Sequence, residues 1–196
     1  MKIRAAATSA LALSAALLLS GCATAADDGS MPGMDHGSSS PSAGADEADA
    51  MFASMMIVHH EQAIEMSDIV LAAEGIDPAV TELAQRIKAA QGPEIEQLEG
   101  WLDEWGISPD DRAASGMDHG DGMMSEDDLT ALRAADGPEA SRLFLEQMIV
   151  HHEGAVEMAQ AQIDDGSDPE AVELVHTIVD AQTDEIQEMK DLLSAL

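Results

Sequence analysis

Three observations predict an all-α fold, a four-helix bundle built from two repeated helical hairpins. Aromatic residues make up 2% of the chain and Tyr is absent, whereas β-strands are enriched in aromatic and β-branched residues. Apolar residues recur with helical spacing through four long segments. The chain also repeats itself, because MMIVHHEQAIEM at residues 55–66 returns as QMIVHHEGAVEM at residues 147–158.

Residues 1–22 have the features of a lipoprotein signal peptide. Lys2 and Arg4 precede a short apolar run that ends in a lipobox-like Leu-Ser-Gly-Cys, and Cys22 is the only Cys in the chain. The run is shorter than a comfortable membrane span, so we expect an export signal with Cys22 as the lipid attachment site. Plain secretion after cleavage nearby is the alternative. We expect an exported protein, lipid-anchored to the cell membrane on its extracytoplasmic side.

The helical bundle is expected over residues 48–196. The preceding residues 23–47 are rich in Ser, Gly, Ala, Pro and Asp, and this composition predicts a disordered tether. The first hairpin covers about 49–105. Its second helix begins at Pro78 after Asp77 as N-cap.

A linker rich in Met, Gly and Asp follows at about 106–124. Ser125 is the expected N-cap of a short helix after this linker. The second hairpin covers about 138–196, and its second helix begins at Pro169 after Asp168 as N-cap.

The repeat places polar residues on the apolar faces of the helices. The first and third long helices align at an offset of 151 − 59 = 92 residues, and the second and fourth at 185 − 94 = 91. The helical rotation of about 100° per residue puts His59 and Glu94 inward, with His60 at the boundary of the apolar face. The equivalent residues of the second hairpin are His151, Glu185 and His152, and the inward glutamines are Gln91 and Gln182.

An inward carboxylate needs a partner, because an unpaired charge in a low-dielectric interior is costly. The inward His and Glu therefore pair with each other or bind a metal ion, and on these residues alone a buried hydrogen-bond network and a metal site are equally open. Methionines near the histidines favour copper, which thioether and imidazole ligands suit. The candidate ligands in the bundle are His59, His60, His151, His152, Met56, Met66, Met148, Met158, Glu94 and Glu185.

Met-Asp-His-Gly occurs twice, once in the tether and once in the linker between the hairpins. Core packing does not explain methionines in such polar segments, where they are open to oxidation. These segments are suited to capture Cu(I) through sulfur and Cu(II) through imidazole, with compositional drift as the alternative. The residues concerned are Met34, His36, Met117, His119, Met123 and Met124.

The formal net charge is −31, from 39 acidic and 8 basic residues. Such a chain repels nucleic acid, so we expect no nucleic-acid partner. The sequence also has no Cys pair, Gly-rich phosphate loop or Ser-centred nucleophile motif, which argues against hydrolytic chemistry.

Both hairpins carry His-His-Glu in their first helix and Gln-x-x-Glu in their second. In the first hairpin the wider pattern consists of Phe52, Met56, His59, His60, Glu61, Ala63, Met66, Gln91, Glu94, Ile95, Leu98, Trp101 and Leu102. This pattern resembles the bacterial family called domain of unknown function 305, over about residues 48–196. The second copy departs from it at Leu192 and Leu193, which stand where the first has Trp101 and Leu102. The resemblance implies a ferritin-like helical bundle, export and, for some relatives, copper binding and tolerance.

We therefore expect an exported lipoprotein that binds metal, with copper favoured, for sequestration, buffering or delivery in the cell envelope. Iron and zinc stay open as the metal, and so does an oligomeric state. A copper exporter or copper oxidase is the expected partner. A binding function is favoured over an enzymatic one. Two alternatives stay open, a ferritin-like di-metal oxidoreductase, whose usual Glu-x-x-His spacing is absent here, and a metal-free structural or interaction protein.

Overall fold

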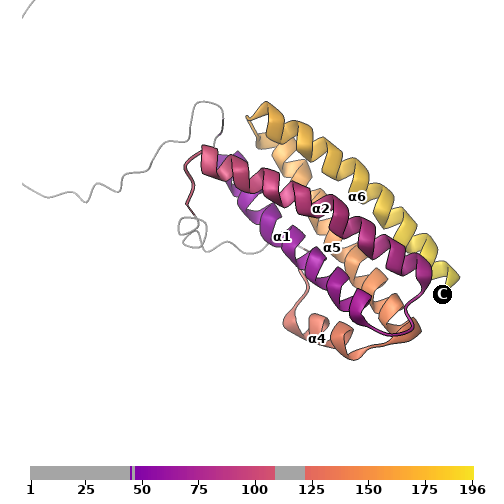
Figure 1. The fold of residues 1–196 in the computed structure, drawn as a ribbon. Coiled ribbons are helices and arrows are strands. Elements are labelled where there is room, and N and C mark those ends of the chain that lie inside the picture. Colours follow the sequence, from indigo (N-terminus) through magenta and orange to yellow (C-terminus); the bar gives the residue numbers. More distant parts are fainter. Residues whose placement is uncertain (1–44, 46, 109–121) are drawn as a thin grey trace, which may run out of the picture. The chain divides into compact units, whose positions relative to one another are not determined.

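The computed structural model describes residue 45 and residues 47–108 and 122–196. These parts of the chain hold five α-helices and no strand. Figure 1 shows the four long helices beside one another, with the shorter α4 next to them. The helices are α1 (Glu47–Ala72), α2 (Pro78–Glu104), α4 (Glu126–Ala134), α5 (Gly137–Asp165) and α6 (Pro169–Ala195). The predicted all-α four-helix bundle of two hairpins is confirmed.

The helices begin at the capping residues that the sequence predicts. The carboxylate of Asp77 accepts a hydrogen bond of 2.8 Å from Ala79 N at the start of α2, and Asp168 caps α6 in the same way. Ser125 and Asp128 form a reciprocal capping box at α4. These side chains satisfy amide groups that the first helical turn leaves without partners.

A central seam between α1 and α5 joins the two hairpins. α1 packs against α2 within the first hairpin and α5 against α6 within the second, while α1 and α5 pack against each other. The start of α1 meets the end of α5, where Asp49 contacts Gln162, and the middle of α1 meets the middle of α5 at His59 and His151. α1 and α5 therefore run antiparallel along the seam.

The short helix α4 lies across the α1–α5 seam and contacts both helices. The residues before it pass close over α5, because a Cβ atom added at Gly122 would lie 2.8 Å from the carbonyl oxygen of Val150. They are then fixed to α1, where the Gln62 side chain hydrogen bonds both the backbone N and the backbone O of Met124. The end of the linker thus bridges the seam.

The apolar core consists of two clusters with a polar layer between them. In α1 the first cluster ends at Ile57 and the second begins at Ala63, and in α5 the second ends at Met148 and the first resumes at Ala155. The interval in each helix holds a His-His pair. We call the polar residues at this level the histidine layer; its members are His59, His60, His151, His152, Gln91, Gln182, Glu94 and Glu185.

None of the helices in the described ranges is long and apolar enough to cross a membrane. The predicted signal peptide with Cys22 and nearly all of the predicted tether lie outside the described residues.

Candidate metal centre

The centre of the histidine layer is a contact between His59 and His151 across the α1–α5 seam. Both side chains are fully buried. Their ring centroids lie 3.7 Å apart and their planes are inclined by 39°. These two histidines point inward as the sequence predicts, and the seam brings them together because they are equivalent residues of the repeat.

The other two histidines pair with glutamates inside their own hairpins. His60 Nε2 lies 2.8 Å from Glu94 Oε2, and His152 Nε2 lies 2.8 Å from Glu185 Oε2. The expectation that Glu94 pairs with the inward His59, and Glu185 with the inward His151, is therefore wrong. His60 and His152 are also fully buried and are not boundary residues.

The error has a geometrical cause. The apolar stripe that contains His59 is expected to face the core, with His60 at its edge, but α1 has neighbours on two sides, α2 and α5. Adjacent residues differ by about 100° around a helix, so His59 can face α5 while His60 faces α2. The glutamates keep limited contact with water, since the side chains of Glu94 and Glu185 are 18% and 19% exposed.

The carboxylates orient the histidines that they contact. An ionised carboxylate only accepts hydrogen bonds, so Nε2 of His60 and of His152 carries a proton and donates it to the glutamate. In a neutral imidazole the other nitrogen then has a lone pair. Nδ1 of each ring is buried and has no hydrogen-bond partner in the described part of the chain. Each hairpin thus holds a carboxylate–histidine unit whose Nδ1 has no hydrogen-bond partner among the described residues.

Six imidazole nitrogens of the layer are buried without a partner among the described residues. They are both ring nitrogens of His59 and of His151 and the Nδ1 atoms of His60 and His152. Most buried polar atoms in folded proteins have a hydrogen-bond partner, so this group of atoms calls for a ligand. In the described ranges, however, no three His, Cys, Asp or Glu side chains surround a common point as metal ligands would.

The environment keeps the central pair neutral. Burial lowers the pKa of His59 to about 3, and the positive charge that His60 or His152 carries when protonated lowers it further. Burial likewise holds the pKa of His151 well below its usual value, the neighbouring histidines add to the effect, and the backbone of His59 opposes it only in part. Desolvation disfavours the charged imidazolium. Each of the two rings is therefore neutral near neutral pH, with one protonated nitrogen and one nitrogen whose lone pair is free to bind a metal.

The predicted methionine ligands are spread over both sides of the layer. Met56 and Met148 each precede a His-His pair by three residues and are fully buried, as is Met66, whereas Met158 is partly buried. Met56 belongs to the first apolar cluster and Met148 and Met66 to the second. Imidazole nitrogens and thioethers fit copper as a donor set.

Of the predicted linker and tether ligands, the structure describes two. Met123 and Met124 are partly exposed, and Met124 is bound through its backbone to Gln62. The remaining four, Met34, His36, Met117 and His119, lie outside the described residues.

Comparison with known proteins identifies the family. The model of the family described as Domain of unknown function (DUF305) matches residues 49–193. The chain belongs to the DUF305 family. No match to a curated protein was found.

Three solved structures resemble this DUF305 protein. A DUF305 protein from Streptomyces coelicolor is 34% identical with a TM-score of 0.69, and the match covers 76% of this chain and 93% of that one. A DUF305 fragment from Deinococcus radiodurans is 33% identical with a TM-score of 0.66, covering 78% and 99%. CopM in its Cu(I)-bound form is 32% identical with a TM-score of 0.63, covering 75% and 96%.

Sequence reasoning missed two features of the DUF305 chain that the structure shows. One is the assignment of each glutamate to the second histidine of its pair, which the adjacent seam of Ile57 and Ile64 on α1 could have indicated. The other is an open pocket beside the seam lined by Met51 and Met55, two residues that lie one helical turn apart.

Proposed function

We propose that this protein is an exported, lipid-anchored copper-binding protein that holds copper at the histidine layer and buffers or delivers it in the cell envelope. The observation that carries the proposal is the group of six buried imidazole nitrogens without a partner in the described part of the chain. A hydrogen-bond network alone would leave these atoms unsatisfied, at a cost of about 1–3 kcal/mol for each buried group. A bound metal ion would satisfy several of them at once.

Copper is favoured over other metals by the donors and by similarity. Thioether sulfur suits Cu(I) and imidazole suits both oxidation states of copper, and Met56 and Met148 lie one turn from the histidines. The related CopM has been solved in Cu(I)-bound and Cu(II)-bound forms. Zinc and iron are the competing metals, and titrations with each of them test this preference.

The residues of the layer would have different roles. His59 and His151 would supply nitrogens from the centre of the seam, and their contact at 3.7 Å means that the rings must separate to admit an ion. His60 and His152 would supply Nδ1, while Glu94 holds the ring of His60. A carboxylate in this position orients a ligating histidine and raises its basicity.

Export and anchoring support an envelope location. Residues 1–22 have the composition of a lipoprotein signal ending at Cys22, and the Streptomyces coelicolor relative is described as a candidate secreted protein. Met-Asp-His-Gly in the tether and linker would serve as capture arms for copper. A copper exporter or copper oxidase would be the partner. Loss of membrane association in a Cys22→Ala variant would test the anchor.

Binding to the layer is tested with the full chain and a variant that removes the central pair. The His59→Leu, His151→Leu double variant replaces the rings by apolar side chains of similar size, so the core stays filled. We expect it to bind Cu(I) and Cu(II) at least tenfold more weakly than the parent chain in chelator-competition titrations. The exposed His176 provides the control, and His176→Gln should bind as the parent does.

The same titrations decide between the alternatives. Equal copper affinity in the parent and the double variant would contradict binding at the layer. Tighter binding of iron, together with oxygen-dependent turnover, would support the di-metal oxidoreductase instead. A thermal midpoint that copper, zinc and iron all leave unchanged would favour the metal-free protein, because a ligand that binds the folded state stabilises it.

A further inference from the structure

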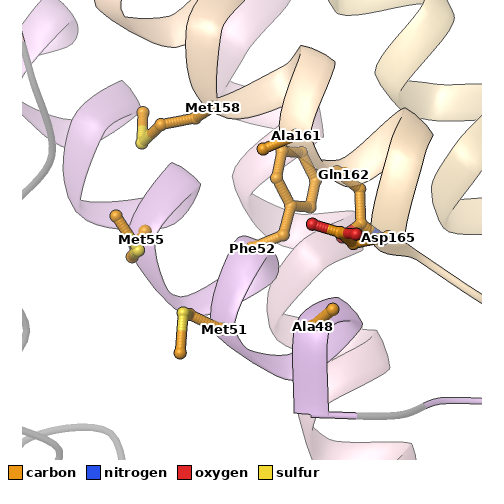
Figure 2. Close-up of a pocket in the computed structure, with 8 residues that line it drawn as sticks. All are labelled: Ala48, Met51, Phe52, Met55, Met158, Ala161, Gln162 and Asp165. Carbon is orange, nitrogen blue, oxygen red and sulfur yellow. The ribbon is translucent and has the colours of Figure 1, made fainter.

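A pocket of about 240 Å³ opens beside the α1–α5 seam, away from the central histidine pair. Figure 2 shows Met51 and Met55 from α1, with Met158 reaching over from α5. The lining residues are Ala48, Met51, Phe52, Met55, Met158, Ala161, Gln162 and Asp165. Three thioethers from two helices thus line one cavity.

Core packing explains Met158 in part, since it lies against the first apolar cluster, but it does not explain Met51 and Met55. Met51 is 49% exposed, and Met55 and Met158 are partly exposed. A long apolar side chain on the surface gains little stability from burial and exposes a thioether to oxidation. Their grouping at an open pocket therefore points to a role in binding.

The internal repeat provides a control for this pocket. At the offset of 92 residues, Met51 corresponds to Leu143 and Met55 to Gln147, while Met158 corresponds to Met66. The equivalent surface, formed by the start of α5 and the end of α1, thus keeps a single thioether of the three, Met66, and it is fully buried.

The surface that corresponds to this pocket in the repeat, at the start of α5 and the end of α1, is covered by α4. α4 contacts both α1 and α5, and its residues Leu129 and Leu132 share an apolar cluster with Met66. The amide of Gln147 donates a hydrogen bond of 3.1 Å to the backbone oxygen of Asp128 in α4. Among the described residues, one groove is therefore filled by α4, and the groove with three thioethers is left open.

We propose that this pocket is a second metal site, which binds a soft monovalent cation, Cu(I) or Ag(I), through the thioethers of Met51, Met55 and Met158. Thioether sulfur is a neutral, soft donor that selects Cu(I), whereas zinc and Cu(II) prefer nitrogen and oxygen. The ligands carry no charge, and the exposed carboxylate of Asp165 on the same pocket balances a single positive charge.

The side chains must close around the ion, because a cavity of about 240 Å³ is larger than one ion requires. Each methionine has three rotatable side-chain bonds and adapts its position easily. Met51 and Met55 lie one turn apart on α1, so their sulfur atoms can reach the same point. Closure therefore needs rotation of side chains and no movement of the helices.

This site extends the proposed copper function but uses different residues. The histidine layer binds through imidazole and serves both oxidation states, whereas the described residues that line the methionine pocket include no imidazole and favour monovalent ions. Loss of one site therefore leaves the other measurable, and the two proposals can fail separately.

The test uses the full chain with Ag(I) as a redox-stable probe and with Cu(I) under anaerobic reducing conditions. The Met51→Leu, Met55→Leu, Met158→Leu triple variant removes the sulfurs and nearly conserves side-chain volume. We expect it to bind one equivalent fewer of each ion than the parent chain, with Cu(II) and zinc binding unchanged. Met189→Leu, at a buried methionine of α6 that belongs to neither proposed site, is the control and should retain the full stoichiometry.

Methyl resonances of ¹³C-labelled methionine locate the ion. Assigned by single Leu variants, the signals of Met51, Met55 and Met158 should shift together as one equivalent of Ag(I) is added, also in the His59→Leu, His151→Leu background. Equal stoichiometry in the parent and the triple variant would overturn the proposal. So would pocket methyl signals that stay unchanged while other methionines titrate.

Discussion

Asp49 and Ser141 occupy equivalent positions in the two repeats, and each accepts a hydrogen bond from the turn of the opposite hairpin. Their separation of 141 − 49 = 92 residues is the offset of the histidine pairs. Ser141 Oγ accepts from Asp77 N at 3.0 Å, and Asp49 Oδ2 accepts from Asp168 N at 3.1 Å. Asp77 and Asp168 are the N-caps of α2 and α6, so each hairpin holds the start of the other's second helix.

The two contacts should differ in strength. Asp49 is fully buried and also accepts hydrogen bonds from the backbone and hydroxyl of Ser167 and from the Gln162 amide. Asp49→Ala leaves several buried donors without an acceptor, and we expect it to lower the free energy of unfolding by about 3 kcal/mol. Ser141→Ala removes one acceptor and should cost about 1 kcal/mol. Urea unfolding measures both, and equal losses would contradict the difference.

Stability should fall as the pH is lowered from 7.5 to 5. The pKa of His59 is lowered to about 3 and that of His151 is also lowered, while in the unfolded chain both stay near 6.5. Below pH 6.5 the unfolded state therefore binds more protons. The stability that the neutral pair contributes is complete above pH 6.5. It is lost as the pH falls toward the pKa that His59 has in the folded protein.

Urea unfolding as a function of pH checks this expectation. For each of the two histidines, the free energy of unfolding should fall by up to about 1.4 kcal/mol per pH unit below 6.5. The His59→Leu, His151→Leu variant should lack this component, and His176→Gln should keep it. Comparison with these variants removes the opposing effect of carboxylate protonation, which relieves repulsion in a chain of net charge −31. Parallel curves for the parent and the double variant would show that the pair does not titrate as expected.

The fold could be predicted from the sequence because its signals are local. Asp-Pro at 77–78 and at 168–169 determines where α2 and α6 begin, since Asp caps a helix and Pro fits its first turn. The repeat then implies two similar hairpins. The position of α4 across the seam was not predictable, because it depends on contacts such as Gln62 with Met124 that join distant parts of the chain.

The sequence predicts which residues form the histidine layer. It does not predict which histidine each glutamate contacts. Helical periodicity identified buried histidines and glutamates, but one angle per residue cannot show which neighbouring helix a side chain faces. The contact of His60 with Glu94 depends on the positions of α1 and α2 around the bundle axis. The methionine pocket depends on an opening that α4 leaves uncovered, which no pattern within α1 or α5 reveals.

If copper binds at the histidine layer, the glutamates should control its affinity. Glu94 accepts the Nε2 proton of His60 and leaves Nδ1 bare, and a neutral amide orients the ring less strongly. We expect the Glu94→Gln, Glu185→Gln double variant to bind copper about 10–100-fold more weakly, measured by chelator competition. Glu96→Gln, at an exposed position on α2, should have no effect. An unchanged affinity in the double variant would exclude this role of the carboxylates.

The attachment of α4 should depend on Gly122. Its φ angle of +94° is unfavourable for other residues, and an added Cβ would lie 2.8 Å from Val150 O and 2.9 Å from the Cα atom of Gly154. Both neighbours are backbone atoms of α5, so they cannot move aside as a flexible side chain would. Gly122→Ala should therefore combine backbone strain with a steric conflict, and we expect a loss of about 3 kcal/mol.

Gly106 offers a matched control for that substitution. It has a φ angle of +76° but no heavy atom within 4 Å of an added Cβ, so Gly106→Ala should cost only the strain, about 1 kcal/mol. The larger effect at Gly122 should also be local. Because the backbone of Met124 joins α4 to Gln62 of α1, hydrogen exchange at the amides of Glu126–Ala134 should become faster than in the rest of the bundle. Similar losses of stability at the two glycines, or exchange in α4 that stays unchanged, would show that the linker does not hold α4 through this close approach.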